Sequence, residues 1–311
     1  MPEQELLAGQ DWLGNRTRSL FVRNDMNRRH FLALAAVAPL SLLAASCGSR
    51  TSVSTDGTGT STPTTEATTT TPGIAHPSGP DDVVISLAYD GGFVAPGTIF
   101  TRLPRVLITG DGSVYFEGAQ TAIYPQPLLP PIFVARISEG ELQALLLSAE
   151  SGGLFRAVTY GPPATGIADA PNTILVINAN GATYTHDAYA LGMAGDELNE
   201  DRHNFLEYVS LLEPIANGVP DSQPFAASRF AFRATPADQV PDDGIAPSEA
   251  TWPAVAGVRL ADASTCGVVE ASALGTLFSE SKQNTRFVEN GVKYVLIVRP
   301  MLPGDPGCAA R

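Results

Sequence analysis

The sequence predicts an α+β fold, in which antiparallel β-hairpins and amphipathic helices follow one another in blocks after an export segment and a tether. Three observations predict it. β-Branched strand segments meet at Asp-Gly and Asn-Gly turns, which suit tight hairpins. Apolar residues at helical spacing follow a capping sequence that begins at Ser138. Strands and helices do not alternate regularly, as they would in a doubly wound parallel sheet.

Residues 1–47 form the predicted signal segment, with Met26 as the expected translation start. Two adjacent cations, Arg28 and Arg29, precede an apolar stretch at 31–45 that ends in small residues. This order of charged, apolar and small residues is typical of an export signal. The surrounding sequence, Asn-Arg-Arg-His-Phe-Leu, is similar to the twin-arginine export motif, in which a receptor reads the arginine pair.

The three cysteines divide into one in the leader and two near the C-terminus. Cys47 follows Ala-Ala-Ser and resembles the cysteine of a bacterial lipobox, so we expect it to carry a lipid that anchors the protein. An exported chain matures in an oxidising compartment, which predicts a disulfide between Cys266 and Cys308. The alternatives are a cleaved signal with Cys47 as a bystander, and two free thiols at a metal site, for which the sequence has no CxxC.

Residues 48–81 are rich in Thr, Ser, Gly and Pro. Such a segment buries too little apolar area to offset its chain entropy, which predicts a disordered tether. A flexible chain of this length reaches roughly 30 Å, so it would hold the folded part close to its anchor.

The first folded domain is predicted at 82–218. Ser138 and Glu141 form a capping box that opens a helix, and a Gly-Gly pair ends it. A second helix is expected at 198–213, with Pro214 just beyond its end. Strands are expected at 83–89, 106–109, 113–116, 173–178 and 183–186.

The second folded domain is predicted at 219–311 and contains the two C-terminal cysteines. A strand is expected within 225–232, and apolar residues at helical spacing predict a helix at 269–279. An Asn-Gly turn joins the closing hairpin, whose strands are expected at 285–288 and 293–298.

Composition excludes several functional classes. The chain has 19 Lys+Arg against 32 Asp+Glu and a net charge of −13, so it lacks the cationic face that nucleic-acid binding needs. No apolar run approaches the roughly 20 residues of a membrane-spanning helix, which excludes a multi-span protein. The sequence has neither a P-loop nor a G-x-S-x-G nucleophile motif. We therefore assign no catalytic residue, no metal and no cofactor.

Three features leave alternatives open. His186, at the end of a predicted strand, is expected to face solvent, with a catalytic role as the alternative. Acidic residues at 196–201, with His203 nearby, are expected to favour a helix N-terminus, and a divalent-cation site is the alternative. The proline-rich segment 124–131 is interpreted as a stiff connection, and a polyproline contact with a partner is the alternative.

Several short motifs together resemble secreted lipoproteins of actinobacteria. They are Thr-Gly-Asp-Gly-Ser-Val at 109–114, the helix from Ser138, Ala-Asp-Ala-Pro-Asn-Thr at 168–173, and Arg-Pro-Met-Leu-Pro at 299–303 within the tail. The resemblance covers most of 82–308 and is carried by turns and strand ends. It implies no activity and transfers no functional residue to this chain.

These observations favour a non-enzymatic binding or interaction protein displayed outside the cell. We expect it to be lipid-anchored to the outer face of the cytoplasmic membrane, with secretion as the alternative. The expected partners are the membrane, through the anchor, and an envelope or secreted protein or ligand. The alternative functions are an extracellular hydrolase using His186 or the acidic cluster near Asp196, and an inhibitor of a secreted enzyme.

Overall fold

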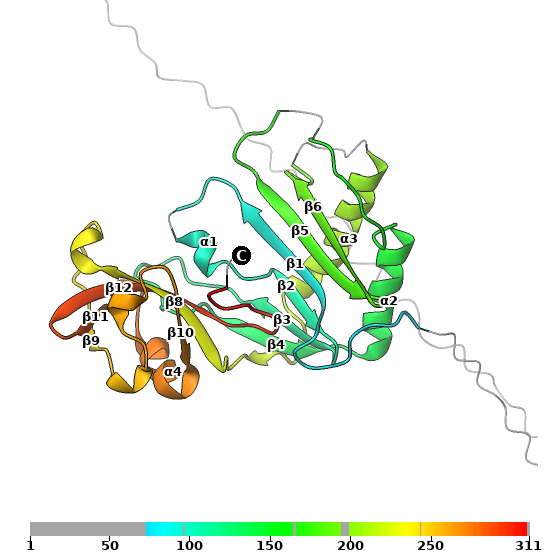
Figure 1. Ribbon diagram of the computed structural model, residues 1–311. Helices are drawn as coiled ribbons and strands as arrows, with labels where there is room; N and C mark the ends of the chain where they lie inside the picture. The colour runs from blue at the N-terminus through cyan, green and yellow to red at the C-terminus, as the bar shows by residue number, and fades with distance from the viewer. Residues whose placement is uncertain (1–72, 96, 164–165, 194–198, 243, 310–311) are drawn as a thin grey trace, which may run out of the picture. The chain divides into compact units, whose positions relative to one another are not determined.

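Two β-sheets organise the part of the chain that the computed structural model describes, which is 73–309 apart from 96, 164–165, 194–198 and 243 (Figure 1). Antiparallel strands and packed helices confirm the α+β prediction. Arg28, Arg29, Cys47 and most of the predicted tether lie outside the described residues. No helix of the described part is long and apolar enough to cross a bilayer.

The first sheet has seven strands, and each pairs antiparallel with its neighbours. Asn180 and Gly181 both have positive φ, as a tight Asn-Gly hairpin turn requires, whereas the Asp-Gly turn has positive φ only at Gly112. The strand order is β6 (Ala182–Tyr189), β5 (Pro171–Ala179), β1 (Val83–Gly91), β2 (Val106–Thr109), β3 (Ser113–Glu117), β4 (Ile132–Arg136) and β7 (Gln223–Pro224).

Helices α2 (Glu139–Ser151) and α3 (Glu200–Ala216) pack with the first sheet around the larger core (Figure 1). The predicted capping box of α2 is confirmed, since Glu141 N donates to Ser138 Oγ at 3.3 Å and Ser138 N donates to Glu141 Oε2 at 2.7 Å. The predicted end of the second helix is wrong, because α3 continues through Pro214 to Ala216. Ala216 and Leu212 are buried there, so packing extends the helix past the proline.

The opposite face of the first sheet contacts the C-terminal segment. Leu107 and Tyr115 point to this face and form a small cluster with Leu302. The first strand after the predicted boundary at 218/219 is β7, and it pairs with β4 of this first sheet. The described residues all belong to a single compact unit, Thr68–Arg311.

The second sheet has the order β10 (Gly267–Glu270), β8 (Arg229–Pro236), β12 (Val292–Pro300), β11 (Arg286–Glu289) and β9 (Glu249–Thr251). Helix α4 (Ala271–Glu280) lies beside β10 (Figure 1). Its Phe278 packs among Phe232, Trp252 and Phe287 in an aromatic core. The short helices are α1 (Thr98–Thr101), η1 (Ala237–Gln239), η2 (Ala254–Ala256) and η3 (Leu260–Asp262).

Two segments make more contacts than the sequence indicated. Residues 73–81, expected within the tether, pack against α2 and the larger core: Ile74 is buried, and its N–H donates to Gln143 Oε1 at 2.8 Å. The proline-rich segment 124–131 lies between β3 and β4, where Leu128 is buried in the aromatic core and its N–H donates to Ser281 O at 2.9 Å. The segment 124–131 therefore connects the first sheet to the core of the second sheet.

Candidate functional site

An exposed apolar loop follows β1 and lies beside a cleft. We define it by Phe93, Val94 and Ile99, which are 91%, 38% and 58% exposed. Gly91 and Gly92 both have positive φ and turn the chain outward at the end of β1. Three large apolar side chains are thereby presented to solvent within a short stretch of chain.

Gly97 and Arg102 shape the chain around the apolar loop. Gly97 has φ +88°, and a Cβ there would lie 3.1 Å from Ile297 Cδ1, so a larger residue would disturb the packing of α1 on β12. Arg102, which follows the loop, is bonded back to the end of β1. Its Nη1 donates to Asp90 Oδ1 at 3.2 Å, and its Nη2 donates to Gly91 O at 3.1 Å. The Arg102 bonds therefore tie the two ends of the apolar loop together.

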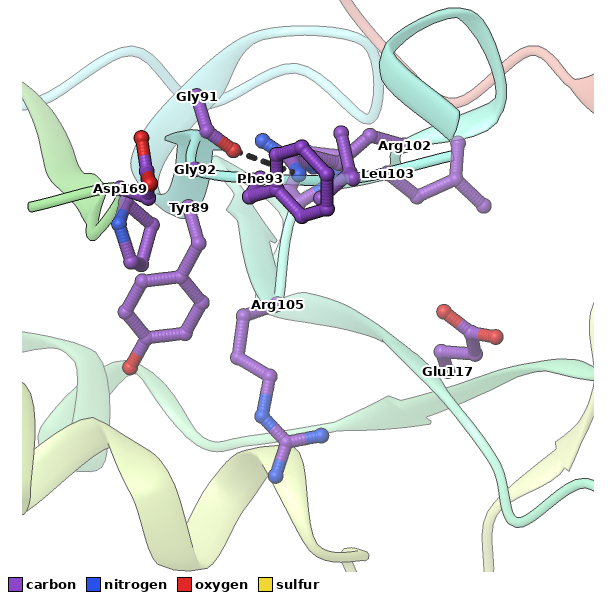
Figure 2. Close-up of a pocket in the computed structure, with 12 residues that line it drawn as sticks. Tyr89, Gly91, Gly92, Phe93, Arg102, Leu103, Arg105, Glu117 and Asp169 are labelled. Carbon is purple, nitrogen blue, oxygen red and sulfur yellow. Dashed lines mark hydrogen bonds between the residues drawn. The ribbon is translucent and has the colours of Figure 1, made fainter. Parts of the chain in front are cut away.

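A cleft of about 450 Å³, the Tyr89 cleft, lies on one side of the apolar loop (Figure 2). Tyr89 and Arg105 both point toward α3 in Figure 2. There, Tyr89 OH donates to Glu213 Oε1 at 2.7 Å, and Arg105 Nη2 donates to Glu213 Oε2 at 3.2 Å and to Asn217 Oδ1 at 2.6 Å. Burial, reinforced by the hydrogen bond to Glu213, raises the pKa of Tyr89 far above its usual range. Tyr89 therefore stays protonated and serves as a structural donor.

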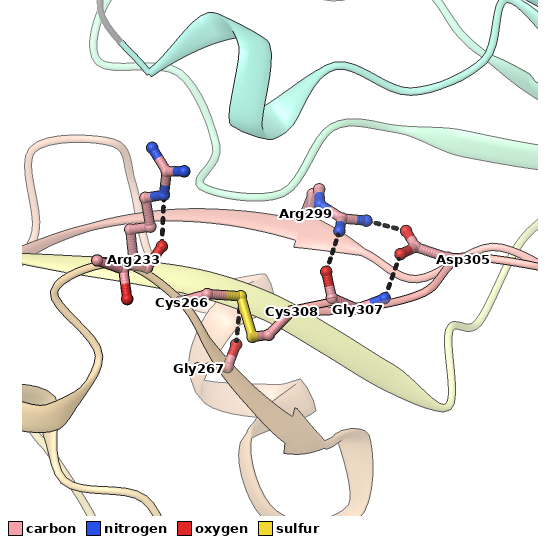
Figure 3. The surroundings of a disulfide bond; sticks show 8 residues. Arg233, Cys266, Gly267, Arg299, Asp305, Gly307 and Cys308 are labelled. Atoms are coloured by element: carbon pink, nitrogen blue, oxygen red, sulfur yellow. Dashed lines mark hydrogen bonds and ion pairs between the residues drawn. A yellow bond between two sulfur atoms is a disulfide. The ribbon is translucent and has the colours of Figure 1, made fainter. Parts of the chain in front are cut away.

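A second cleft, of about 660 Å³, lies beside the Cys266–Cys308 disulfide, and we call it the disulfide cleft. Val94 lines both clefts. Two guanidinium groups face the Phe100 ring of α1, with the Cζ atoms of Arg233 and Arg299 at 4.6 Å and 5.5 Å from its centroid. Figure 3 shows these arginines beside the disulfide.

The predicted disulfide is present, with its two Cα atoms 5.6 Å apart. It ties the loop before β10 to the C-terminal tail, next to a buried cluster on the tail (Figure 3). In that cluster Arg299 forms an ion pair with Asp305 and donates from Nη2 to Gly307 O at 3.0 Å. The tail therefore forms one wall of the disulfide cleft.

The expectation that His186 faces solvent is wrong, because its imidazole is fully buried. Its Nε2 lies 2.8 Å from Leu154 O, an acceptor, and its Nδ1 lies 2.8 Å from the Tyr160 hydroxyl. These partners fix a neutral ring that donates from Nε2 and accepts at Nδ1. Burial lowers the pKa of His186. With both nitrogens engaged inside the protein, His186 has a structural role.

The acidic cluster is only partly within the described residues, since Asp196 and Glu197 lie outside them. Glu200 and Asp201 occupy the first turn of α3, where the helix dipole favours negative charge, and Asp201 pairs with Arg156. Among the described residues, no group of three or more His, Cys, Asp or Glu side chains is arranged to hold a metal ion.

The sequence reasoning missed the apolar loop and the arginines of the disulfide cleft. A local signal for the loop exists, because Gly-Gly directly before Phe-Val at 91–94 is a turn followed by apolar residues. The approach of Arg233 to Phe100 has no such signal, since it joins residues that are far apart in the chain.

Comparisons with protein-family models, with curated proteins and with solved structures gave no match.

Proposed function

We propose that this protein is an exported, lipid-anchored and non-enzymatic binding module, and that the apolar loop is its contact surface for an envelope or secreted protein. The resemblance to secreted lipoproteins of actinobacteria and the leader ending at Cys47 support the location. The disulfide supports maturation in an oxidising compartment.

The observation that carries the proposal is the exposure of Phe93, Val94 and Ile99 together. Exposed apolar side chains that gather on a surface mark interaction sites, and aromatic residues are enriched at the centres of protein interfaces. Fully covering one such side chain contributes about 2 kcal/mol of hydrophobic free energy. The bonds from Arg102 to Asp90 and Gly91 tie the two ends of the apolar loop together, which lowers the entropy cost of binding.

The buried state of His186 gives no support to a hydrolase that uses it as a base, because a base must reach a proton of the substrate. An inhibitor of a secreted enzyme is a special case of the proposal, in which the partner is the enzyme and the apolar loop covers part of its surface.

The test is affinity capture from the envelope and medium of the producing cells, with the full chain as bait. Phe93→Asp places a charge at the most exposed of the three apolar residues, and Val255→Asp is the matched control at a 72% exposed apolar residue elsewhere. We expect one protein to be retained by the wild type and by the control, and its recovered amount to fall at least tenfold with the Phe93→Asp bait. Equal recovery with all three baits, or no specific protein with any of them, would contradict the proposal. Thermal unfolding of each bait checks that the variants are folded.

A further inference from the structure

We infer that the disulfide cleft binds a small ligand that carries a carboxylate or phosphate group on a short apolar body. This site goes beyond the proposed protein contact, because Arg233 in the cleft is its recognition group, while Val94 and Ile99 belong to both surfaces and Phe93 to the protein contact alone. The inference comes from Arg233, its neighbours and the charge balance of the cleft lining.

Arg233 is exposed, and one hydrogen bond and one ring contact orient its guanidinium while its terminal donors stay available. Its Nε donates to Thr265 O at 2.6 Å, and its guanidinium carbon lies 4.6 Å from the centroid of the Phe100 ring. Within the described part of the chain, Nη1 and Nη2 of Arg233 have no hydrogen-bond partner. Figure 3 shows these two nitrogens directed away from the disulfide. Two parallel N–H groups of a fixed guanidinium match the two oxygens of a carboxylate or phosphate.

The charge of the cleft favours an anion. Its described lining includes Arg233 and Arg299 and has no aspartate or glutamate. Asp305 pairs with Arg299 and offsets its charge, whereas no carboxylate of the described residues lies within ion-pair distance of Arg233. In a chain of net charge −13, this is a local site of positive charge, so Arg233 is the residue that would recognise the anionic group.

The other walls accept an apolar body. Val94, Ile99 and the Phe100 ring line the cleft on the side of the apolar loop and α1. The cleft volume of about 660 Å³ lies within the range of small-ligand pockets. The disulfide and the bond from Arg299 Nη2 to Gly307 O hold the opposite wall, so the ligand would meet a largely formed site.

The experiment is calorimetric titration of the full chain with hexanoate, hexyl phosphate, hexanamide and inorganic phosphate. We expect hexanoate or hexyl phosphate to bind at least tenfold more tightly than neutral hexanamide, because only the anions use the charge of Arg233. The tighter of the two identifies the anionic group. Inorganic phosphate is expected to bind more weakly than hexyl phosphate, because it lacks the apolar body.

Three variants assign the binding to residues. Arg233→Gln is expected to lower the affinity for the tighter-binding anion about tenfold or more. Arg229→Gln, which removes an arginine from the same strand but outside this cleft, is expected to leave it unchanged. Phe93→Asp, which tests the protein contact, is also expected to leave it unchanged, so the two proposals can fail separately. Equal binding of hexanamide, no binding of either hexyl anion, or equal binding by Arg233→Gln would overturn the inference.

Discussion

The buried His186 should make the stability of the fold depend on pH in a way that one substitution removes. His186 is enclosed by Leu154 and Tyr160, and its ring centroid lies 5.6 Å from that of Phe205. Burial is the main cause of its lowered pKa, and the nearby charge of Arg156 lowers it further, against the opposing effect of the Leu154 hydrogen bond. The folded state therefore holds the ring neutral at a pH where the unfolded chain binds a proton.

The sign and size of the effect follow from linkage. The His186 pKa is lowered from its ordinary value of 6.5, so below that pH the unfolded state binds more protons and stability falls as the pH falls. If the folded ring stays neutral, the loss between about pH 7.5 and about pH 5.5 is at most about 1.4 kcal/mol. His186→Gln removes the titration while its amide can still donate to Leu154 O and accept from Tyr160.

Urea unfolding at the two pH values measures this directly. On acidification, we expect the free energy of unfolding of the wild type to fall by up to about 1.4 kcal/mol more than that of His186→Gln. His203→Gln is the control, because His203 is exposed on α3, and it should keep the wild-type dependence. The same pH dependence in wild type and His186→Gln would refute the assignment of His186 as a buried neutral residue.

Two further predictions concern the cysteines. Replacing both Cys266 and Cys308 by alanine should lower the free energy of unfolding by about 4 kcal/mol, which is the chain-entropy value for a sequence separation of 42. Urea unfolding with and without reductant measures this loss, and an unchanged unfolding midpoint would contradict the prediction. Cys47 should be the first residue of the mature chain and should carry a diacylglycerol. Mass spectrometry of the N-terminal peptide from the envelope fraction measures the mass of this modification, and an unprocessed N-terminus would contradict the prediction.

Local signals in the sequence predicted the features that depend on neighbouring residues. The capping box at Ser138 and the positive φ values of Asn180 and Asn290 arise from short-range geometry, so residue type and spacing are enough to anticipate them. The disulfide was predictable from the number of cysteines together with the expectation of an exported chain. The hairpin turns and the capped helix were the local features that predicted the α+β class.

Features that depend on distant segments were not predictable in this way. His186 lies on an edge strand, yet Leu154 and Tyr160 from another segment cover it, which no pattern within the strand reveals. Strands β7 and β9 are too short to show an alternating pattern and exist because of their partners. The disulfide cleft likewise depends on Arg233 and Phe100 meeting across the fold.

Site-specific photo-crosslinking in the producing cells tests the central claim most directly. A photoreactive amino acid replaces Phe93 in the full chain, and a second chain carries it at Val255, another exposed apolar position. A binding module that uses the apolar loop should give one discrete crosslinked envelope or secreted protein from position 93 and none of that species from position 255. The same species from both positions, or no adduct from position 93, would contradict the account.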